Sequence, residues 1–280
     1  MISFFARIFG YLLNFLYNIV NNYGVAIILF SIIIKILMIP LSIKQQKTMK
    51  KNAKMQTEMK QIQFKYKNDP EKLNQETMAL YKRENMSPFS GCLSAIVQII
   101  LLFSVFYLVR QPLTYMKKID PNIISNYTTQ IKEEGKTTNN AYPEIDIIRE
   151  KADQEEVKVN MDFFGLDLSK IPTSDAKDLK VWIIPILYVL SSIISMKITN
   201  KMQATMNGEN KKVEGEEKEE NPMEQANKSM SLMMPIMSVS IAIVAPLGMA
   251  LYWLLNNILM IGERLILNKV IKDEEETENV

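Results

Sequence analysis

The chain has 280 residues with 33 basic and 31 acidic side chains, so a formal charge of +2 identifies no class of partner. It contains no His and one Cys, Cys92, which excludes His-based acid–base catalysis, His-containing triads, the common zinc sites and an internal disulfide. We therefore expect no catalytic residue, no metal site and no cofactor. Long apolar stretches alternate with strongly charged ones, a segregation that soluble domains rarely show.

Residues 1–22 are apolar and aromatic, but Arg7, Asn14 and Asn18 interrupt them. This composition predicts an amphipathic helix that lies in the membrane interface. A short signal peptide is the alternative. One basic residue near the start and the lack of a clear small-residue cleavage site make it a poor match.

Five segments have the length and composition of membrane-spanning helices, which need about 20 mostly apolar residues. The first occupies residues 23–43, the second 93–110 and the third 181–198, while the fourth and fifth form a tight hairpin over 230–267. Each could instead be a core helix of a soluble protein, but five in one chain favour an all-α membrane protein with five transmembrane helices.

The charges that flank the spans predict an orientation, since Lys and Arg gather on the cytoplasmic side. Five lysines follow the first span before the first acid, Glu58, whereas Arg7 is the only basic residue that precedes it. We expect the N-terminus outside and the C-terminus inside. The cytoplasmic parts are then 44–92, 199–229 and the acidic tail 268–280, and the long extracellular loop is 111–180.

The first cytoplasmic segment, 44–92, predicts a helical hairpin. Helix formers run from Lys44 to Lys67, and Asp69 with Pro70 suits the start of a second helix. Residues 44–88 carry 11 basic and 5 acidic side chains. This excess is either ordinary positive-inside charge or a surface for anionic lipid, ribosomal RNA or an emerging apolar chain, with no specific nucleic-acid sequence. The candidate recruitment surface consists of Lys47, Lys50, Lys51, Lys54, Met55 and Met59.

The extracellular loop is polar through its middle and becomes amphiphilic over residues 161–168. We expect this amphiphilic piece to touch the outer membrane face.

Lys35 is the most unusual residue, because it is the twelfth of the twenty residues 24–43. A charge near the centre of a spanning helix costs about 2.5–3.5 kcal/mol on insertion scales, so such residues usually serve a function or face a wet cavity. Snorkelling to the interface is the alternative. Ser31 lies one turn earlier on the same helix face. Gln98, Tyr252, Trp253, Asn256 and Asn257 are the other polar or amphipathic span residues, for which helix-to-helix hydrogen bonding is the alternative role.

Three stretches resemble the YidC, Oxa and Alb membrane protein insertases. They are YGVAIILFSIIIKILMIPLSIKQQKTMKKNAKMQ, KYKNDPEKLNQETMALYKRENMSPFSGCLSAIVQ and APLGMALYWLLNNILMIGERLIL. They stand in the family's order, and the resemblance covers roughly residues 20–110 and 160–270.

The resemblance implies five core helices around a hydrophilic groove that is open to the cytoplasm and lipid and closed outside. The groove cation, usually Arg in the family, falls on Lys35, which keeps the charge without the planar guanidinium. An aromatic substrate contact falls on Trp253, with Tyr252 beside it. Gln98 is followed by Ile99 and Ile100 where the family often has Gln-Met-Pro. Without a large N-terminal outer domain, the chain resembles the compact form of Gram-positive bacteria.

The sequence thus favours an insertase of the bacterial plasma membrane that performs no covalent chemistry. Its expected partners are nascent membrane proteins, the ribosome, the lipid bilayer and the Sec translocon. One alternative is a small-solute transporter or channel with Lys35 as an anion site. That function predicts internal repeats or paired broken helices, which the sequence does not show. An intramembrane enzyme is a weaker alternative, because the chain has no His and only one Cys.

Overall fold

A computed structural model describes residues 1–84, 90–136, 139–206 and 239–278 of the chain. These residues are mostly helical, and four helices are long and apolar enough to cross a membrane. The four stretches are Ile2–Val20, Tyr23–Asn52, Leu179–Met202 and Leu247–Leu267, and Ile96–Arg110 is a shorter apolar helix. The predicted fold class is confirmed, since the chain is an all-α membrane protein.

The predicted spans map onto these helices with two differences. The first, third and fifth lie in α2 (Tyr23–Lys65), α7 (Ile183–Met206) and α9 (Leu247–Glu278), and the second lies in α4 (Ser90–Arg110). The fourth lies mostly outside the described residues, of which 239–244 are helical. The stretch predicted to lie in the interface forms α1 (Ile2–Val20), which is also long enough to cross.

The chain forms two compact units. Unit 1 comprises Met1–Ile36, Ile100–Ile194 and Glu220–Met260. Unit 2 comprises Leu37–Ile99, Ser195–Glu219 and Ile261–Val280.

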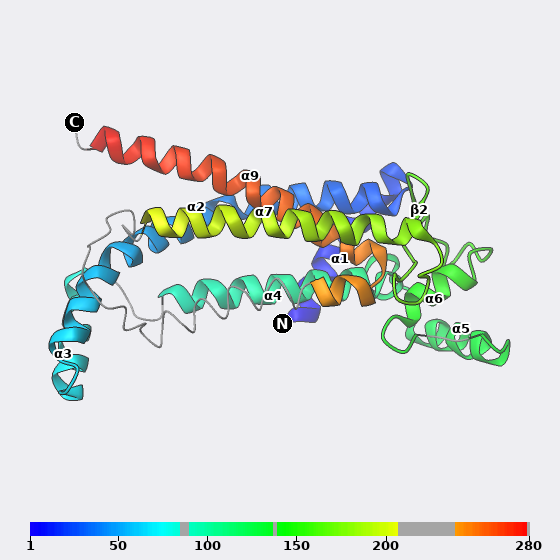
Figure 1. Cartoon of the computed structure of the whole chain (residues 1–280). Coiled ribbons are helices and arrows are strands. Elements are labelled where there is room, and N and C mark those ends of the chain that lie inside the picture. The colour runs from blue at the N-terminus through cyan, green and yellow to red at the C-terminus, as the bar shows by residue number, and fades with distance from the viewer. Residues whose placement is uncertain (85–89, 137–138, 207–238, 279–280) are drawn as a thin grey trace. The chain divides into compact units, whose positions relative to one another are not determined.

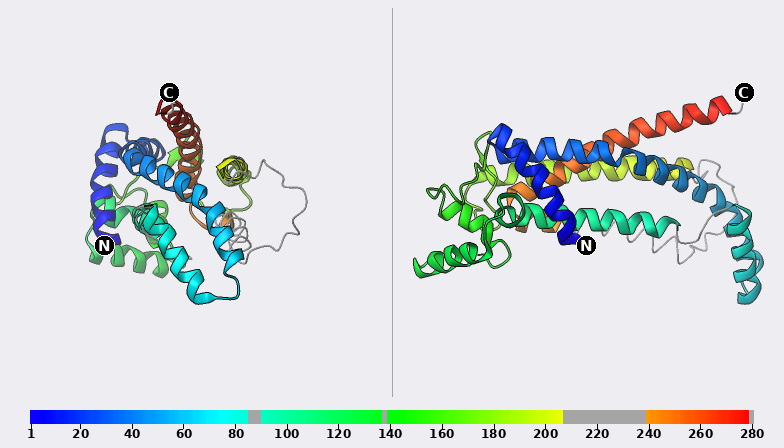
Figure 2. Two further views of the ribbon diagram at one scale, coloured as in Figure 1. Left: turned by 90° about the vertical axis from the view of Figure 1, so that its left-hand side faces the viewer. Right: turned by 180° about the vertical axis from the view of Figure 1, so that it is seen from behind.

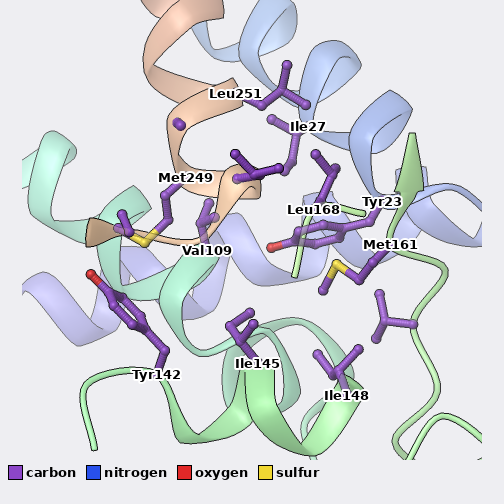
Figure 3. Close-up of a cluster of buried hydrophobic side chains, with 14 of the residues drawn as sticks. Tyr23, Ile27, Val109, Tyr142, Ile145, Ile148, Met161, Leu168, Met249 and Leu251 are labelled. Carbon is purple, nitrogen blue, oxygen red and sulfur yellow. The ribbon is translucent and has the colours of Figure 1, made fainter. Parts of the chain in front are cut away.

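The core of unit 1 is apolar and draws on helices and on the long loop alike. Figure 3 shows Ile27 of α2, Val109 of α4, Met249 of α9 and the loop residue Leu168 gathered above Ile145. Each of these side chains is at most 3% exposed. The loop after α4 is therefore part of the folded body of unit 1.

The loop itself contains several short elements. They are the π-helix η1 (Leu113–Lys117), α5 (Pro121–Glu133), α6 (Pro143–Glu150), β1 (Asp162–Phe163), β2 (Leu166–Asp167) and the 3₁₀-helix η2 (Leu179–Trp182). The strands β1 and β2 form an antiparallel hairpin in which Asp162 pairs with Asp167 and Phe163 with Leu166. Helix α5 packs against α6, and β2 contacts η2.

Helix α1 packs closely on η1. After α1 the chain changes direction sharply and enters α2, as Figure 2 shows. A Cβ on Gly10 would overlap the backbone carbonyl of Tyr115, so only glycine allows this approach. The helix ends at Asn21, which adopts the left-handed conformation with φ 47°. Asn22 then caps α2, because its side-chain oxygen accepts a hydrogen bond of 3.1 Å from the Val25 amide.

A buried carboxylate fixes η1 to α6. Glu144 is 3% exposed and accepts hydrogen bonds from the backbone amides of Leu113 at 2.7 Å and Thr114 at 3.0 Å. The Thr114 hydroxyl donates a third bond of 2.6 Å. Burial raises the pKa of Glu144 above its ordinary value, and these hydrogen bonds oppose that rise.

Residues 160–173, here called the clasp, join the N-terminal ends of α2 and α9 through backbone hydrogen bonds. The Tyr23 amide donates to the Asn160 carbonyl at 2.9 Å. The amides of Leu247 and Gly248 donate to the carbonyls of Lys170 and Leu168 at 2.9 and 3.0 Å. The first amides of a helix have no partner within it, so the clasp supplies acceptors that these two apolar helices need.

In unit 2, the C-terminal part of α2 and α3 (Pro70–Arg83) form the predicted hairpin. The predicted cap is confirmed, since the Asp69 side chain accepts a hydrogen bond of 3.1 Å from the Lys72 amide. Arg83 pairs with Glu58 across the hairpin. The first predicted span and the first arm of the hairpin form one helix, since α2 runs through Pro40 to Lys65.

Candidate functional site

Lys35 lies in the apolar part of α2, as predicted, and its side chain is half-buried. Its neighbours Ile32 and Ile36 are exposed, which is the expected state for side chains that face lipid. Lys35 therefore stands between the packed and the exposed sides of the helix. A cation there must meet water, polar groups or headgroups, because hydrocarbon alone solvates it poorly.

Ser31, one turn before Lys35, is 5% exposed, and its hydroxyl donates a hydrogen bond of 2.7 Å to the Ile27 carbonyl. A serine that bonds four residues back along its own helix satisfies its hydroxyl without a partner helix.

The aromatic pair Tyr252 and Trp253 lies in the second turn of α9, and both side chains are half-buried. The Trp253 ring centroid is 6.2 Å from that of Tyr188 on α7, with the two planes tilted by 38°. This distance is typical of an aromatic contact. Lys35, Ser31, Tyr252 and Trp253 all belong to unit 1.

Asn257, one turn after Trp253, shows the interhelical hydrogen bonding that was the alternative role for such residues. Its side-chain amide donates to Ser192 Oγ at 2.7 Å and lies 3.5 Å from Ser191 Oγ. The Ser191 hydroxyl in turn donates to the Tyr188 carbonyl at 2.8 Å. Sequence reasoning missed the two serines, and their adjacency within the third predicted span was the available signal.

Gln98 belongs to unit 2, where it is exposed and its amide donates a hydrogen bond of 2.7 Å to Gln45 Oε1 of α2. The bond links α4 to α2 inside that unit. Its role as a groove residue stays a prediction.

The exposed residues of the predicted recruitment surface are lysines, whereas its methionines are partly or fully buried. Lys47 and Lys51 are exposed and Lys50 is half-buried, and Lys51 donates to the backbone carbonyl of Glu84. Met55 is 5% exposed and Met59 accepts a long hydrogen bond of 3.7 Å from the Thr77 hydroxyl of α3. The two methionines therefore face the hairpin interior, and lysines form the accessible surface. The side chain of Lys54 lies outside the described residues.

No group of three or more His, Cys, Asp or Glu side chains within the described ranges is arranged to hold a metal ion.

The chain is similar to a family of membrane proteins and to several of its named members. A family model described as "60Kd inner membrane protein" matches residues 15–275. Relatives named "Membrane protein insertase YidC" include one from Chloroherpeton thalassium, 28% identical over 93% of this chain and 35% of its own length. One from Caldanaerobacter subterraneus is 43% identical over 38% of this chain and 51% of its own length. One from Syntrophus aciditrophicus is 51% identical over 34% of this chain and 17% of its own length. The chain thus spans between about a sixth and a half of these relatives.

Proposed function

Because this chain belongs to the 60Kd inner membrane protein family, whose match spans residues 15–275, we propose that it is a membrane protein insertase. It admits polar segments of nascent membrane proteins into a positively charged, hydrated groove and releases their apolar segments into the bilayer. The similarity to relatives named membrane protein insertase supports this proposal. No covalent chemistry takes part.

The observation that carries the mechanism is the position of Lys35 in α2, among residues apolar enough to cross a membrane. Transfer of a polar segment into hydrocarbon is unfavourable mainly because its charges lose water. A half-buried ammonium lowers that cost for an acidic segment, since opposite charges attract strongly where the effective dielectric constant is low. Ser31, one turn earlier on the same face, is a further polar residue of the proposed groove.

The apolar part of the substrate needs a different surface. Trp253 and Tyr252 are half-buried on α9 and so present both packed and accessible ring area. Aromatic rings contact apolar chains with little loss of side-chain entropy. We assign them contact with the substrate segment that moves into lipid.

The cytoplasmic hairpin recruits the substrate. Its accessible lysines, Lys47 and Lys51 among them, suit the ribosome or anionic lipid. The excess of Lys and Arg after the first span supports a cytoplasmic hairpin, an outer N-terminus and a location in the bacterial plasma membrane. The Sec translocon is a further proposed partner.

A depletion experiment tests the charge-attraction mechanism. Cells depleted of their resident insertase receive wild-type protein, Lys35→Ala, Lys35→Arg or the matched control Lys44→Ala, which removes an exposed lysine further along α2. We expect Lys35→Ala to reduce insertion of a single-span substrate with an acidic outer tail. Lys35→Arg and Lys44→Ala should insert this substrate near the wild-type rate. Equal insertion by Lys35→Ala at equal protein levels would refute the mechanism.

Photo-crosslinking tests the aromatic contact directly. A crosslinker at position 253 should capture a stalled nascent membrane protein, whereas one at Ile258, an exposed residue on another face of α9, should capture mostly lipid. Capture at neither position would exclude α9 from the substrate path.

A further inference from the structure

The turn between β1 and β2 has a backbone that its sequence does not favour. Phe164 and Gly165 form a two-residue connection with φ values of 51° and 76°. Positive φ at both central residues defines a type I′ turn, for which Asn-Gly or Asp-Gly is strongly preferred. Here an aromatic residue occupies the first position, where an L side chain with a bulky ring is strained.

The Phe164 side chain also gains little from the fold. Its ring meets Phe163 edge-on with centroids 4.8 Å apart, yet the residue remains 87% exposed. Asparagine would adopt this backbone conformation more readily than phenylalanine, and its polar side chain is suited to an exposed position. A residue that is both conformationally strained and apolar in an exposed position points to a role outside the folded core.

The hairpin behind this turn is held firmly against the start of α2. The Asn22 side-chain amide donates to the Asp162 carbonyl at 2.6 Å. A Cβ on Gly24 would overlap the Phe163 ring, so the ring lies directly on the helix backbone. Phe164 is therefore presented at the end of a helix that can cross a membrane.

A second exposed apolar residue lies on the neighbouring element. Leu179 begins η2, which β2 contacts, and it is 81% exposed. It is also the first residue of the apolar stretch Leu179–Met202. Figure 1 shows β2 beside the first turns of α7. Phe164 and Leu179 thus stand where two membrane-crossing stretches begin, and Trp182, a residue type enriched at membrane interfaces, follows within the same turn.

We propose that Phe164 and Leu179 insert into the interface of the lipid bilayer and anchor the clasp to the membrane surface. Interfacial segments bury Phe, Leu and Trp side chains at the boundary between headgroups and acyl chains. The two residues are isolated projections at the ends of spans, which suits a fluid lipid surface better than a shaped protein partner. The inference rests on the chain being a membrane protein and is independent of the insertase proposal.

Site-specific fluorescence tests the anchor. Cys92 is the only Cys, so a Cys92→Ser background accepts single probes at Phe164→Cys and Leu179→Cys, with Gln154→Cys as an exposed control in the same loop. The full-length protein is placed in vesicles of phosphatidylethanolamine and phosphatidylglycerol that carry nitroxide lipids at shallow or deep positions. We expect labels at 164 and 179 to emit at shorter wavelength than the label at 154. We also expect the shallow nitroxide to quench them more than the deep one.

Two results would overturn the proposal. Emission and quenching equal to those of the 154 label would place both residues in water. A blue shift without lipid quenching would mean that protein, either a second copy or another chain, covers them.

A second variant separates anchoring from folding. Phe164→Asn should leave the thermal unfolding midpoint in detergent unchanged or raise it, because Asn suits the turn. It should also weaken lipid quenching of the 179 label in vesicles. A lower midpoint together with unchanged quenching at 179 would show that Phe164 serves the fold and not the membrane.

Discussion

The side-chain amide of Asn257 on α9 donates a hydrogen bond of 2.7 Å to Ser192 Oγ on α7. Asn257 lies one turn after Trp253, which contacts Tyr188 on the same partner helix. The hydrogen bond therefore fixes the rotation of α9 against α7 at the turn that presents the proposed substrate contact.

Replacing Asn257 by Leu should destabilise the protein, because the interhelical hydrogen bond is lost while the apolar volume is kept. Such bonds between membrane helices contribute about 0.6 kcal/mol on average and up to about 1.7 kcal/mol. Thermal unfolding in detergent measures the change, and a double-mutant cycle with Ser192→Ala isolates the pair. Asn256→Leu is the matched control on a different helix face. Additive effects of Asn257→Leu and Ser192→Ala would contradict the coupling.

Glu144 predicts a pH dependence of stability. Burial raises its folded-state pKa above the ordinary value of 4.5, so the folded protein holds this proton more tightly than the unfolded chain. The contribution of Glu144 is then greatest at low pH and declines as pH rises from about 4.5 through the raised pKa. The decline can reach about 1.4 kcal/mol per pH unit within that window.

The measurement compares wild type with Glu144→Gln across this pH range by denaturant or thermal unfolding. The free energy of unfolding of wild type should exceed that of Glu144→Gln by the largest amount at the acid end of this range. Asp146 is also buried with a pKa raised mainly by burial, and the comparison cancels its contribution. Glu144→Ala should cost more at every pH, since the buried amide of Leu113 and the part-buried amide of Thr114 both lose their acceptor, and an unsatisfied buried donor costs about 1–3 kcal/mol. A pH-independent difference between wild type and Glu144→Gln would refute the assignment.

Gly10→Ala should separate α1 from η1, because the new methyl group would overlap the Tyr115 carbonyl. Overpacking of this kind costs about 1–3 kcal/mol. Gly262→Ala on α9 is the control, since nothing lies within 4 Å of its new Cβ and Ala favours a helix over Gly by about 0.5–1 kcal/mol. Thermal unfolding should therefore move in opposite directions for the two variants, and equal shifts would be inconsistent with the close approach.

Asp69→Ala should weaken the cytoplasmic hairpin by about 1 kcal/mol, the usual contribution of an N-cap side chain. Asp69→Asn keeps a capping oxygen and serves as the control. Limited proteolysis near residues 66–70 reports the opening, and faster cleavage is expected for Ala than for Asn. Similar rates for the two would show that α3 does not depend on this cap.

The sequence was sufficient where the relevant physics is local. Apolar length located α2, α7 and α9, and the Asp69-Pro70 pair located the start of α3. The sequence divided the first span from the hairpin at residue 43, whereas one helix, α2, runs through both. Loop helix α5 was missed although Asp120-Pro121 carries the same signal as Asp69-Pro70, with the Asp120 side chain accepting from the Asn122 amide at 2.8 Å.

Contacts between distant residues could not be predicted from one sequence. Glu144 looks like a surface carboxylate in a polar loop, and only the fold brings it to the amides of Leu113 and Thr114. Met55 looked accessible among lysines, whereas packing of the hairpin buries it. Burial of such a side chain depends on which helix faces pack together. Helical periodicity in a charged segment does not specify the helix against which it packs.

The clasp has a consequence for the order in which the protein itself is made. The amides of Leu247 and Gly248 find their acceptors in Lys170 and Leu168, so these two donors are paired in this way only when α9 meets a segment that is synthesised well before it. Both segments must reach the same side of the membrane first. Pairing of these two donors thereby depends on delivery of the loop to that side, and a chain with the wrong topology leaves them without these acceptors.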